Sequence, residues 1–401
     1  MGGSWPNGVL EGVRVLDLST GIAGPFCARL LADYGADVVK VEPPGGDPLR
    51  RVGPFYGDDP HPEKSLFFLV MNLNKRGITL DLETALGRRL FLELVRWADV
   101  VVESFPPGYL SRLGLDYSLL SGINPRLVLT SITPFGQSGP YSGFAGEEIV
   151  FYAMGGIMAI SGTSDREPLK HGGNQAQYEA GLLGAAATAV ALLHADATGG
   201  GQHLDISITE VVASTMVVHQ PYYAFSGGIH GRRPPKGTLL GNPMPCRDGW
   251  VILQTGGGAT WEEIADFLGK PELRDLKFAT QEGRRVHGEE LDALLLEAVK
   301  DRGRWELFHG AAERRILFGI VQDAKDLAEC PQLAARGFYR EVEHPVIGPI
   351  WVPAVLCNMS LTPYTLRRPA PLLGQHNVEI YCGLLGYSRQ DVVRMRQLGV
   401  I

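Results

Sequence analysis

Short, almost wholly apolar segments alternate with helical patterns in the first third of the chain, and this alternation constrains the fold most. The apolar segments are residues 13–18, 37–41, 98–103 and 127–132. Apolar residues recur at helical spacing after Pro25 and again over residues 83–97. Strands without polar alternation are typical of a parallel sheet that helices cover on both faces. The sequence therefore predicts a Rossmann-like open α/β sheet.

The later chain contains a second, smaller set of predicted elements. A long helix at about 177–195 and a strand at 203–207 precede a stretch rich in glycine and proline at 225–249. A strand at 250–255, helices near 261–268, 289–300 and 305–314, two short β runs at 341–344 and 350–355, and a last helix near 389–398 follow. A chain of 401 residues is too long for one compact core, so we expect two domains.

Charge and cysteine usage limit the compartment and the partners. The chain has 37 Lys+Arg against 44 Asp+Glu, and this mildly acidic balance gives no reason to expect nucleic acid. Its five cysteines are widely spaced without a CxxC pair, which fits a reducing compartment without a metal site. The longest apolar stretch, 180–193, is too short to span a bilayer, and the first residues carry no export signal. We expect a cytoplasmic protein with no membrane partner.

The first turn between strand and helix argues against a dinucleotide cofactor. Residues 19–25 read STGIAGP and lack the GxGxxG pattern that lets the backbone approach a pyrophosphate. Pro25 also removes one amide that would bind the phosphates. The sequence contains neither a Walker A motif nor GxSxG.

Four motifs follow one another along the chain. They read LEGVRVLDL at 10–18 with LADYGADVVKVE at 31–42, NLNKRGITLDL at 72–82, ADVVVESFPPG at 98–108, and TGGGQHLDIS at 198–207. Their order and spacing resemble those of the family III CoA-transferases (CaiB/BaiF type), which include formyl-CoA transferase, carnitine CoA-transferase and the α-methylacyl-CoA racemases. The resemblance implies that CoA enters as an acyl-CoA substrate, that a carboxylic acid is the second substrate, and that no metal takes part.

The resemblance also implies the architecture. Family members form interlocked dimers, in which a large Rossmann-like domain is assembled from both chain ends and a smaller α/β domain lies between. We therefore expect residues 1–224 to form the N-terminal part of the large domain. Residues 225–336 would form the small domain with its linkers, and residues 337–401 would complete the large domain.

Matching the motifs residue by residue gives a set of expected CoA contacts. They are Ile22, Ala23, Asn74, Lys75, Arg76, Ser104, Phe105 and Arg112. Small residues in the first turn let the backbone approach the thioester, and the guanidinium of Arg112 suits a phosphate. Asn74 as the cap of a turn and Lys75 as a solvated charge are the alternatives at those positions.

The reaction that the resemblance implies depends on one aspartate. Its carboxylate attacks the donor thioester to give a mixed anhydride, CoA thiolate returns to form an enzyme thioester, and the acceptor carboxylate then takes the CoA. Residues 168–182 match the frame around that aspartate, and Gln177 stands at its position. An amide forms no anhydride, so the usual nucleophile is missing.

Other acids lie near this position. Glu179 follows Gln177 by two residues, which is about 200° around a helix, so we expect it to face away. Glu147 and Glu148 stand near where the racemases carry a catalytic histidine, and Glu147 is a candidate base for other thioester chemistry.

Three interpretations of the function stay open. We favour a subunit of a CoA-transferase that moves CoA from an acyl-CoA donor, such as succinyl-CoA, to a carboxylic acid. A homologous subunit would then carry the aspartate, as in heteromeric members such as benzylsuccinate CoA-transferase. The second is a stand-alone acyl-CoA enzyme, racemase- or lyase-like, that uses Glu147 or Glu179. The third is a non-catalytic CoA-thioester binding protein.

Overall fold

The computed structural model describes residues 8–232 and 239–401, and the chain divides into two compact units. The large unit contains the chain up to Ile157, Lys170–Pro221 and Ala334–Ile401, and the small unit contains Met158–Leu169 and Tyr222–Leu333. Both chain ends therefore contribute to the large unit. The chain passes between the units after Pro221 and after Leu333, and the segment Met158–Leu169 also belongs to the small unit. Residues 233–238, within the glycine- and proline-rich stretch, lie outside the described residues.

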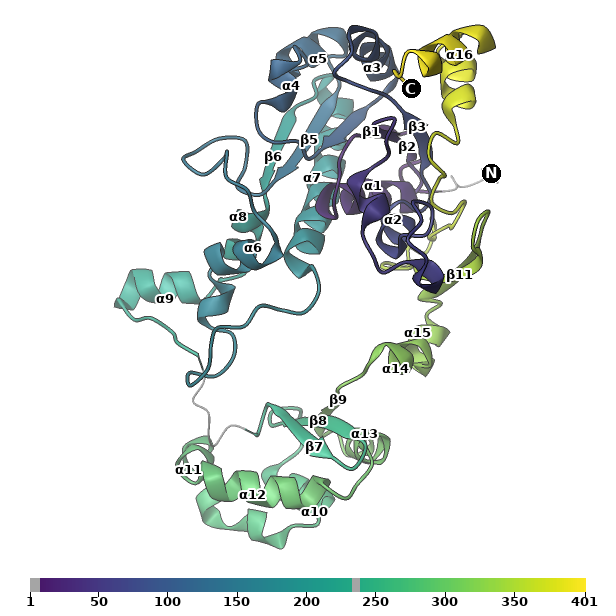
Figure 1. The fold of residues 1–401 in the computed structure, drawn as a ribbon. Helices are drawn as coiled ribbons and strands as arrows, with labels where there is room; N and C mark the ends of the chain where they lie inside the picture. The colour runs from purple at the N-terminus through teal and green to yellow at the C-terminus, as the bar shows by residue number, and fades with distance from the viewer. Residues whose placement is uncertain (1–7, 233–238) are drawn as a thin grey trace, which may run out of the picture. The chain divides into compact units, whose positions relative to one another are not determined.

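A six-stranded sheet with the order β3-β2-β1-β4-β5-β6 forms the centre of the large unit (Figure 1), and all its neighbouring strands are parallel. The strands are β1 (Arg14–Asp17), β2 (Asp37–Glu42), β3 (Arg76–Thr79), β4 (Val100–Glu103), β5 (Val128–Thr133) and β6 (His203–Ser207). The predicted parallel α/β sheet is confirmed, and β3 is a strand that the sequence did not reveal. The strand order reverses between β1 and β4, and open α/β sheets bind ligands beyond the carboxyl ends at such a switch point.

Helices cover both faces of this sheet. On one face, α3 (Ala85–Trp97) shares a core with β-strand residues and with residues of the π-helix Glu379–Leu384 and of α16 (Arg389–Gln397). On the other face, α1 (Ala23–Asp33) and α7 (Gln175–Thr198) pack against each other and against the strands. The remaining helices of this unit include α2 (Leu66–Met71), α4 (Tyr109–Arg112), α5 (Tyr117–Ile123), α6 (Glu148–Met154) and α8 (Ile208–Ser214).

Helix α7 lies against α1 because glycine leaves room for the neighbouring backbone. A Cβ atom on Gly181 would lie 2.6 Å from the carbonyl oxygen of Ala23, and one on Gly184 would lie 3.2 Å from Cys27 Sγ. By length and composition, α7 is the one helix of the described residues that could cross a membrane. It packs against α1, α8 and β5, and 44% of its most apolar window is buried by these contacts and others.

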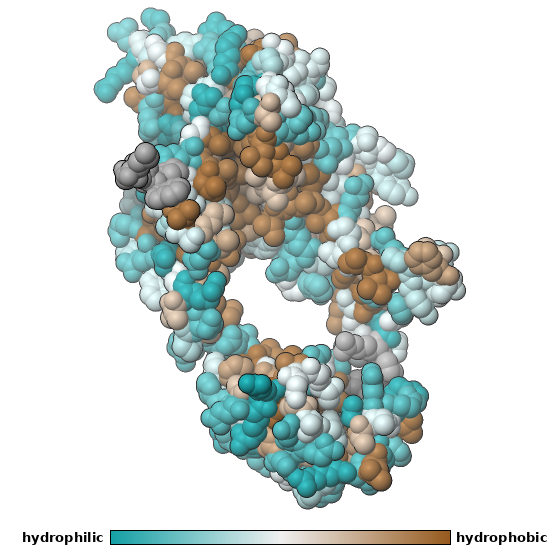
Figure 2. Space-filling model, turned by 180° about the vertical axis from the view of Figure 1, so that it is seen from behind, coloured by the Kyte–Doolittle hydropathy of each residue, from teal (hydrophilic) through white to brown (hydrophobic). Residues whose placement is uncertain are grey.

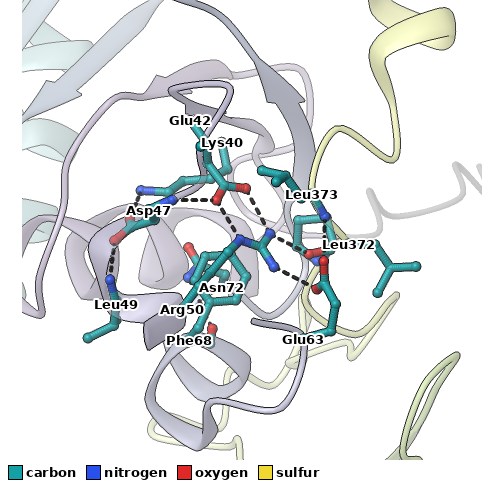
Figure 3. Close-up of polar contacts among 12 residues, drawn as sticks. Lys40, Glu42, Asp47, Leu49, Arg50, Glu63, Phe68, Asn72, Leu372 and Leu373 are labelled. Carbon is teal, nitrogen blue, oxygen red and sulfur yellow. Dashed lines mark hydrogen bonds and ion pairs between the residues drawn. The ribbon is translucent and has the colours of Figure 1, made fainter. Parts of the chain in front are cut away.

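A buried network of charges joins the C-terminal segment to the sheet (Figure 3). Arg50, 1% exposed, binds the carboxylate of Glu42 through Nε at 2.6 Å and Nη2 at 2.8 Å. Its Nη1 lies 2.6 Å from Glu63, and its Nη2 also donates to the carbonyl of Pro371 at 3.0 Å. Leu373 N donates to Glu63 at 3.0 Å. These bonds hold residues 371–373 against the segment that follows β2.

The small unit has its own sheet and its own core. Its strands β7 (Pro243–Cys246), β8 (Gly249–Gln254) and β9 (Leu317–Ile320) are antiparallel in the order β7-β8-β9. The helices α10 (Trp261–Leu268), α12 (Gly288–Val299) and α13 (Arg304–Glu313) supply most of the buried apolar residues, and α11 (Gln281–Val286) supplies none. Helices α9 (His219–Ser226), α14 (Ala324–Ala328) and α15 (Pro331–Ala335) lie near the unit boundaries, and β10 (Tyr339–His344) pairs with β11 (Gly348–Pro353) in the large unit.

Candidate functional site

The two loops that leave the switch point are bonded to each other. Thr20 follows β1, and its N–H donates to Ser104 Oγ at 2.8 Å, while Ser104 Oγ donates back to the carbonyl of Thr20 at 3.2 Å. Ser104 follows β4 directly. These two bonds fix the turn that contains Ile22 and Ala23 beside the segment of Ser104 and Phe105. Four of the expected CoA contacts therefore lie at one place on the sheet edge.

Helix α7 begins beside the same turn. Gly181, in the second turn of α7, allows close approach to the carbonyl of Ala23 at the start of α1. Phe26 of α1 and Tyr178 of α7 contact each other edge to face, with ring centroids 5.1 Å apart. Gln177, adjacent to Tyr178, therefore lies at the same end of the two helices as Ile22 and Ala23.

Glu148 closes the N-terminus of α7. Asn174 precedes the helix without a capping bond from its own side chain. Instead, Glu148 Oε1, from the start of α6, accepts the N–H of Ala176 at 2.8 Å. The carboxylate is buried, 6% exposed, and its charge is favoured by the partial positive charge of a helix N-terminus.

The second oxygen of Glu148 fixes the amide of Gln177. Gln177 Nε2 lies 3.3 Å from Glu148 Oε2. An ionised carboxylate only accepts hydrogen bonds, so the amide nitrogen of Gln177 must be the group that faces it. The carbonyl oxygen of Gln177 is then directed elsewhere, and the group offered at this position is a hydrogen-bond acceptor without nucleophilic reactivity.

The two other candidate acids differ in their surroundings. Glu147 is exposed at the N-cap of α6. Glu179 is half-buried, and burial raises its pKa, with the charge of Glu148 adding to the rise and that of His171 opposing it. Tyr152 lies in the same area, with its hydroxyl 3.3 Å from His171 Nδ1. Glu179 is thus electrostatically linked to the group around Gln177 rather than isolated from it.

Three side chains form a column that leaves the switch point. Phe105 and Tyr109 are stacked with centroids 4.5 Å apart, and Arg112 Cζ lies 5.1 Å from the centre of the Tyr109 ring. Arg112 has an ion pair with Glu83 at 3.2 Å, but its side chain is 66% exposed. Exposed pairs of this kind are weak, so the guanidinium remains accessible to an anion.

The structure separates Asn74, Lys75 and Arg76 from this group. Asn74 donates to Asp33 at 2.7 Å, and Lys75 Nζ contacts Asp17, Asn72 and the carbonyl of Pro25 at 2.8–2.9 Å with 0% exposure. Arg76 binds Asp37 at 2.6 Å and Glu379 at 2.7 Å.

Their polar groups are engaged in contacts within the large unit. Burial lowers the pKa of Lys75 to about 8. Its contact with Pro25 supports the first turn from behind, so Lys75 acts on the site through the backbone that it holds.

Two residues of the site, Thr20 and Tyr109, were not among those expected from the sequence, and Glu148 was expected only as an acid near the position of the racemase histidine. Tyr109 follows Phe105 by four positions and precedes Arg112 by three, a helical spacing that could have indicated the column. Glu148 and Thr20 act through long-range pairing, for which a single sequence gives no signal. Among the described residues, no group of three or more His, Cys, Asp or Glu side chains is arranged to hold a metal ion.

The fold defines an α/β protein with an open parallel sheet, and the switch point of that sheet is its candidate ligand site. More specifically, the chain belongs to CoA-transferase family III, whose family model matches residues 10–377.

Relatives of known activity and a solved structure agree with this assignment. The chain is 36% identical to succinyl-CoA–D-citramalate CoA-transferase of Chloroflexus aurantiacus, over 98% of each protein. It is 34% identical to the BbsE subunit of succinyl-CoA:(R)-benzylsuccinate CoA-transferase of Thauera aromatica, over 95% of this chain and 96% of the relative. A crystal structure of a CAIB/BAIF family protein from Brucella suis matches with a TM-score of 0.84 and 32% identity, over 94% of this chain and 100% of that chain.

Proposed function

We propose that this chain is the aspartate-less subunit of a heteromeric CoA-transferase that moves CoA from succinyl-CoA or a similar donor to a carboxylic acid. The observation that carries the proposal is Gln177 at the start of α7, with its amide held by Glu148 at 3.3 Å. The transfer needs a carboxylate that forms both an anhydride and a thioester, and an amide forms neither. A homologous subunit would supply that carboxylate.

The rest of the site supports binding of a CoA thioester. The Ile22–Ala23 turn lets backbone approach the thioester end, and Phe105 and Tyr109 offer apolar faces to the pantetheine arm or the adenine. Arg112 offers a charge to a phosphate. In this assignment Gln177 orients rather than attacks, because its carbonyl oxygen accepts a hydrogen bond from the ligand. The relative named as subunit BbsE supports a heteromeric assembly.

We further propose that the chain forms an interlocked dimer with its partner. Helix α7 supports this, because Leu182, Leu183, Val190 and Leu193 are 47–70% exposed in the single chain. At 100° per residue these four side chains fall within an arc of about 100°, so they form one apolar helix face. Figure 2 shows apolar residues gathered over one face of the large unit. An uncovered apolar face of this kind is typical of an interface.

The test begins with the assembly. The tagged chain would be isolated from its native cells, and its composition determined by native mass spectrometry. A complex with a homologous chain that carries aspartate at the position of Gln177 is expected. A complex that contains only copies of this chain would overturn the proposal.

Variants of the isolated complex then assign the chemistry. With succinyl-CoA and a panel of dicarboxylic acids, replacing the partner's aspartate by alanine should abolish CoA transfer. Gln177→Ala in this chain should leave most of it. The stand-alone interpretation predicts the reverse, with loss of activity in Glu147→Gln or Glu179→Gln of this chain.

A further inference from the structure

Glu103, the last residue of β4, places a buried carboxylate directly behind the expected CoA contacts. It is 3% exposed, and its Oε2 accepts the N–H of Phe105 at 2.6 Å. Gln137 Nε2 lies 3.5 Å from its Oε1. A carboxylate is costly to bury, and the transfer reaction does not use this one. Its bond to the backbone of Phe105 connects it to the ligand side of the sheet edge.

Polar side chains of the neighbouring strands lie near Glu103. Ser131 on β5 lowers the pKa of Glu103 through its hydroxyl, and Ser131 Oγ lies 2.8 Å from His203 Nε2 on β6. A serine hydroxyl has one hydrogen to donate. When that hydrogen points to the Glu103 carboxylate, His203 Nε2 supplies the hydrogen of the second bond.

Burial and neighbouring charges shift the pKa values of Glu103 and His203. Burial raises the pKa of Glu103 to about 7, against the bonds from Ser131 and Phe105, and the charge of Asp205 on β6 adds to the rise. Burial lowers the pKa of His203, and the charge of Asp205 opposes this shift. The other polar or titratable groups that line the adjoining recess are Tyr109, Ser111, Asp116, Tyr117 and Gln137.

We propose that Glu103 is a positioning residue for CoA, which fixes the backbone of Phe105 and with it the segment against which the ligand lies. This inference rests on the proposed function, because CoA is the ligand concerned. An ionised carboxylate holds the Phe105 N–H by a charge-assisted bond, about twice as strong as a neutral one. When Glu103 is protonated, the carboxyl group that accepts the Phe105 N–H is neutral, so this bond is weaker.

The expected consequence is an affinity for CoA that depends on the charge of Glu103. Above the pKa of Glu103 the Ser104–Phe105 segment is held firmly, and below it the segment is held by a neutral hydrogen bond. The difference between charged and neutral hydrogen bonds corresponds to about fivefold in affinity. Glu103→Gln keeps an acceptor for Phe105 and lacks the charge, so it reproduces the protonated state at every pH.

The experiment is a calorimetric titration of CoA into the purified assembly at pH 6 and pH 8. Glu103→Gln should bind CoA about fivefold more weakly than the wild type at pH 8 and equally at pH 6. Glu343→Gln, an exposed acid on β10, is the matched control and should follow the wild type. Titration of the CoA phosphates affects all variants alike, so it cancels in the comparison.

Two results would overturn the inference. Glu103→Gln that follows the wild type at both pH values, or that is weakened equally at both, would show that the charge of Glu103 does not position the ligand. A wild-type assembly that binds no CoA would remove the proposed function as well, which distinguishes the two failures. If Glu103→Gln does not fold, Ser131→Ala serves instead. Loss of its donor should raise the pKa of Glu103 further and move the change in affinity to higher pH.

Discussion

Gln177 donates its amide nitrogen to Glu148 at 3.3 Å, although the two residues are 29 positions apart in the chain. The same carboxylate accepts the N–H of Ala176, so one buried acid both closes α7 and holds the amide of Gln177. Glu148 thus supplies a negative charge that stabilises the N-terminus of α7. The amide of Gln177 can lie beside this charge because it is neutral and donates a hydrogen bond to it. A second carboxylate at this place would face a like charge.

Gln177→Glu tests this compatibility. Glutamate keeps the shape of glutamine, but it places an oxygen beside Glu148 Oε2 where Gln177 has its donor nitrogen Nε2. Because two close carboxylates repel and the bond is lost, we expect the free energy of unfolding to fall by about 1–3 kcal/mol at pH 8. Chemical denaturation of the variant and the wild type at pH 8 measures the loss.

Gln175→Glu is the matched control for this substitution. Gln175 is exposed in the first turn of α7, where a negative charge is favoured by the helix dipole. We expect unchanged or slightly raised stability. Equal behaviour of the two variants would contradict the pairing of Gln177 with Glu148.

Gly181→Ala tests the approach of α7 to α1. The new Cβ would lie 2.6 Å from the carbonyl oxygen of Ala23, so one helix must shift, at a cost of about 1–3 kcal/mol. The shift would also widen the space between the Ile22–Ala23 turn and Gln177, so CoA transfer by the assembly should fall. Gly122→Ala in α5, where a Cβ meets nothing within 4 Å, should be neutral or stabilising. Thermal unfolding and the transfer assay are the two measurements.

Arg50→Met tests the buried network that attaches the C-terminal segment. The change leaves the carboxylates of Glu42 and Glu63 without the guanidinium that they share, and removing one partner of a buried pair costs about 3–5 kcal/mol. Limited proteolysis should then cleave near residues 371–373, which Arg50 and Glu63 hold. Arg285→Met, which removes an exposed partner of Glu282, should change neither stability nor cleavage. Protection of the segment in Arg50→Met would contradict this role.

The sequence predicted the elements whose signals are local. The strand at 203–207 and the helix at 261–268 have the predicted bounds, since the first follows a glycine turn and the second combines regular apolar spacing with a capping threonine. Strand β3 was missed because its four residues lie inside a charged motif with little apolar pattern. Helix α6 was missed because its seven residues are too few to show a period.

The residues of the candidate site also divide into those that local sequence signals predict and those that they do not. The spacing of the motifs predicts Gln177 at the position of the usual aspartate, and this stays a prediction; an amide is not a nucleophile on chemical grounds alone. The environment of Asn74, Lys75 and Arg76 could not be predicted, because their partners are remote: Lys75 lies 58 positions from Asp17, and Arg76 lies 303 from Glu379. A polar triplet offers donors to a ligand or to the fold equally well, and only tertiary structure decides between them. Glu103 was likewise known only as the end of a strand.

Stability should depend on pH through Glu103. Its pKa is raised by burial to about 7, whereas an unfolded glutamate titrates near 4.3. Between these values the folded protein holds a proton that the unfolded chain has released, so stability contributed by Glu103 falls as pH rises through this window.

Glu103→Gln does not titrate. Relative to that variant, the wild type should lose on the order of 2–3 kcal/mol between pH 4.5 and pH 7.5. Denaturation of both proteins across this range measures the difference, and a constant difference would show that the carboxyl titrates normally. The ionised form is thus the less stable one in the free protein and the one that holds Phe105 most firmly, so binding of CoA should recover part of the loss at high pH.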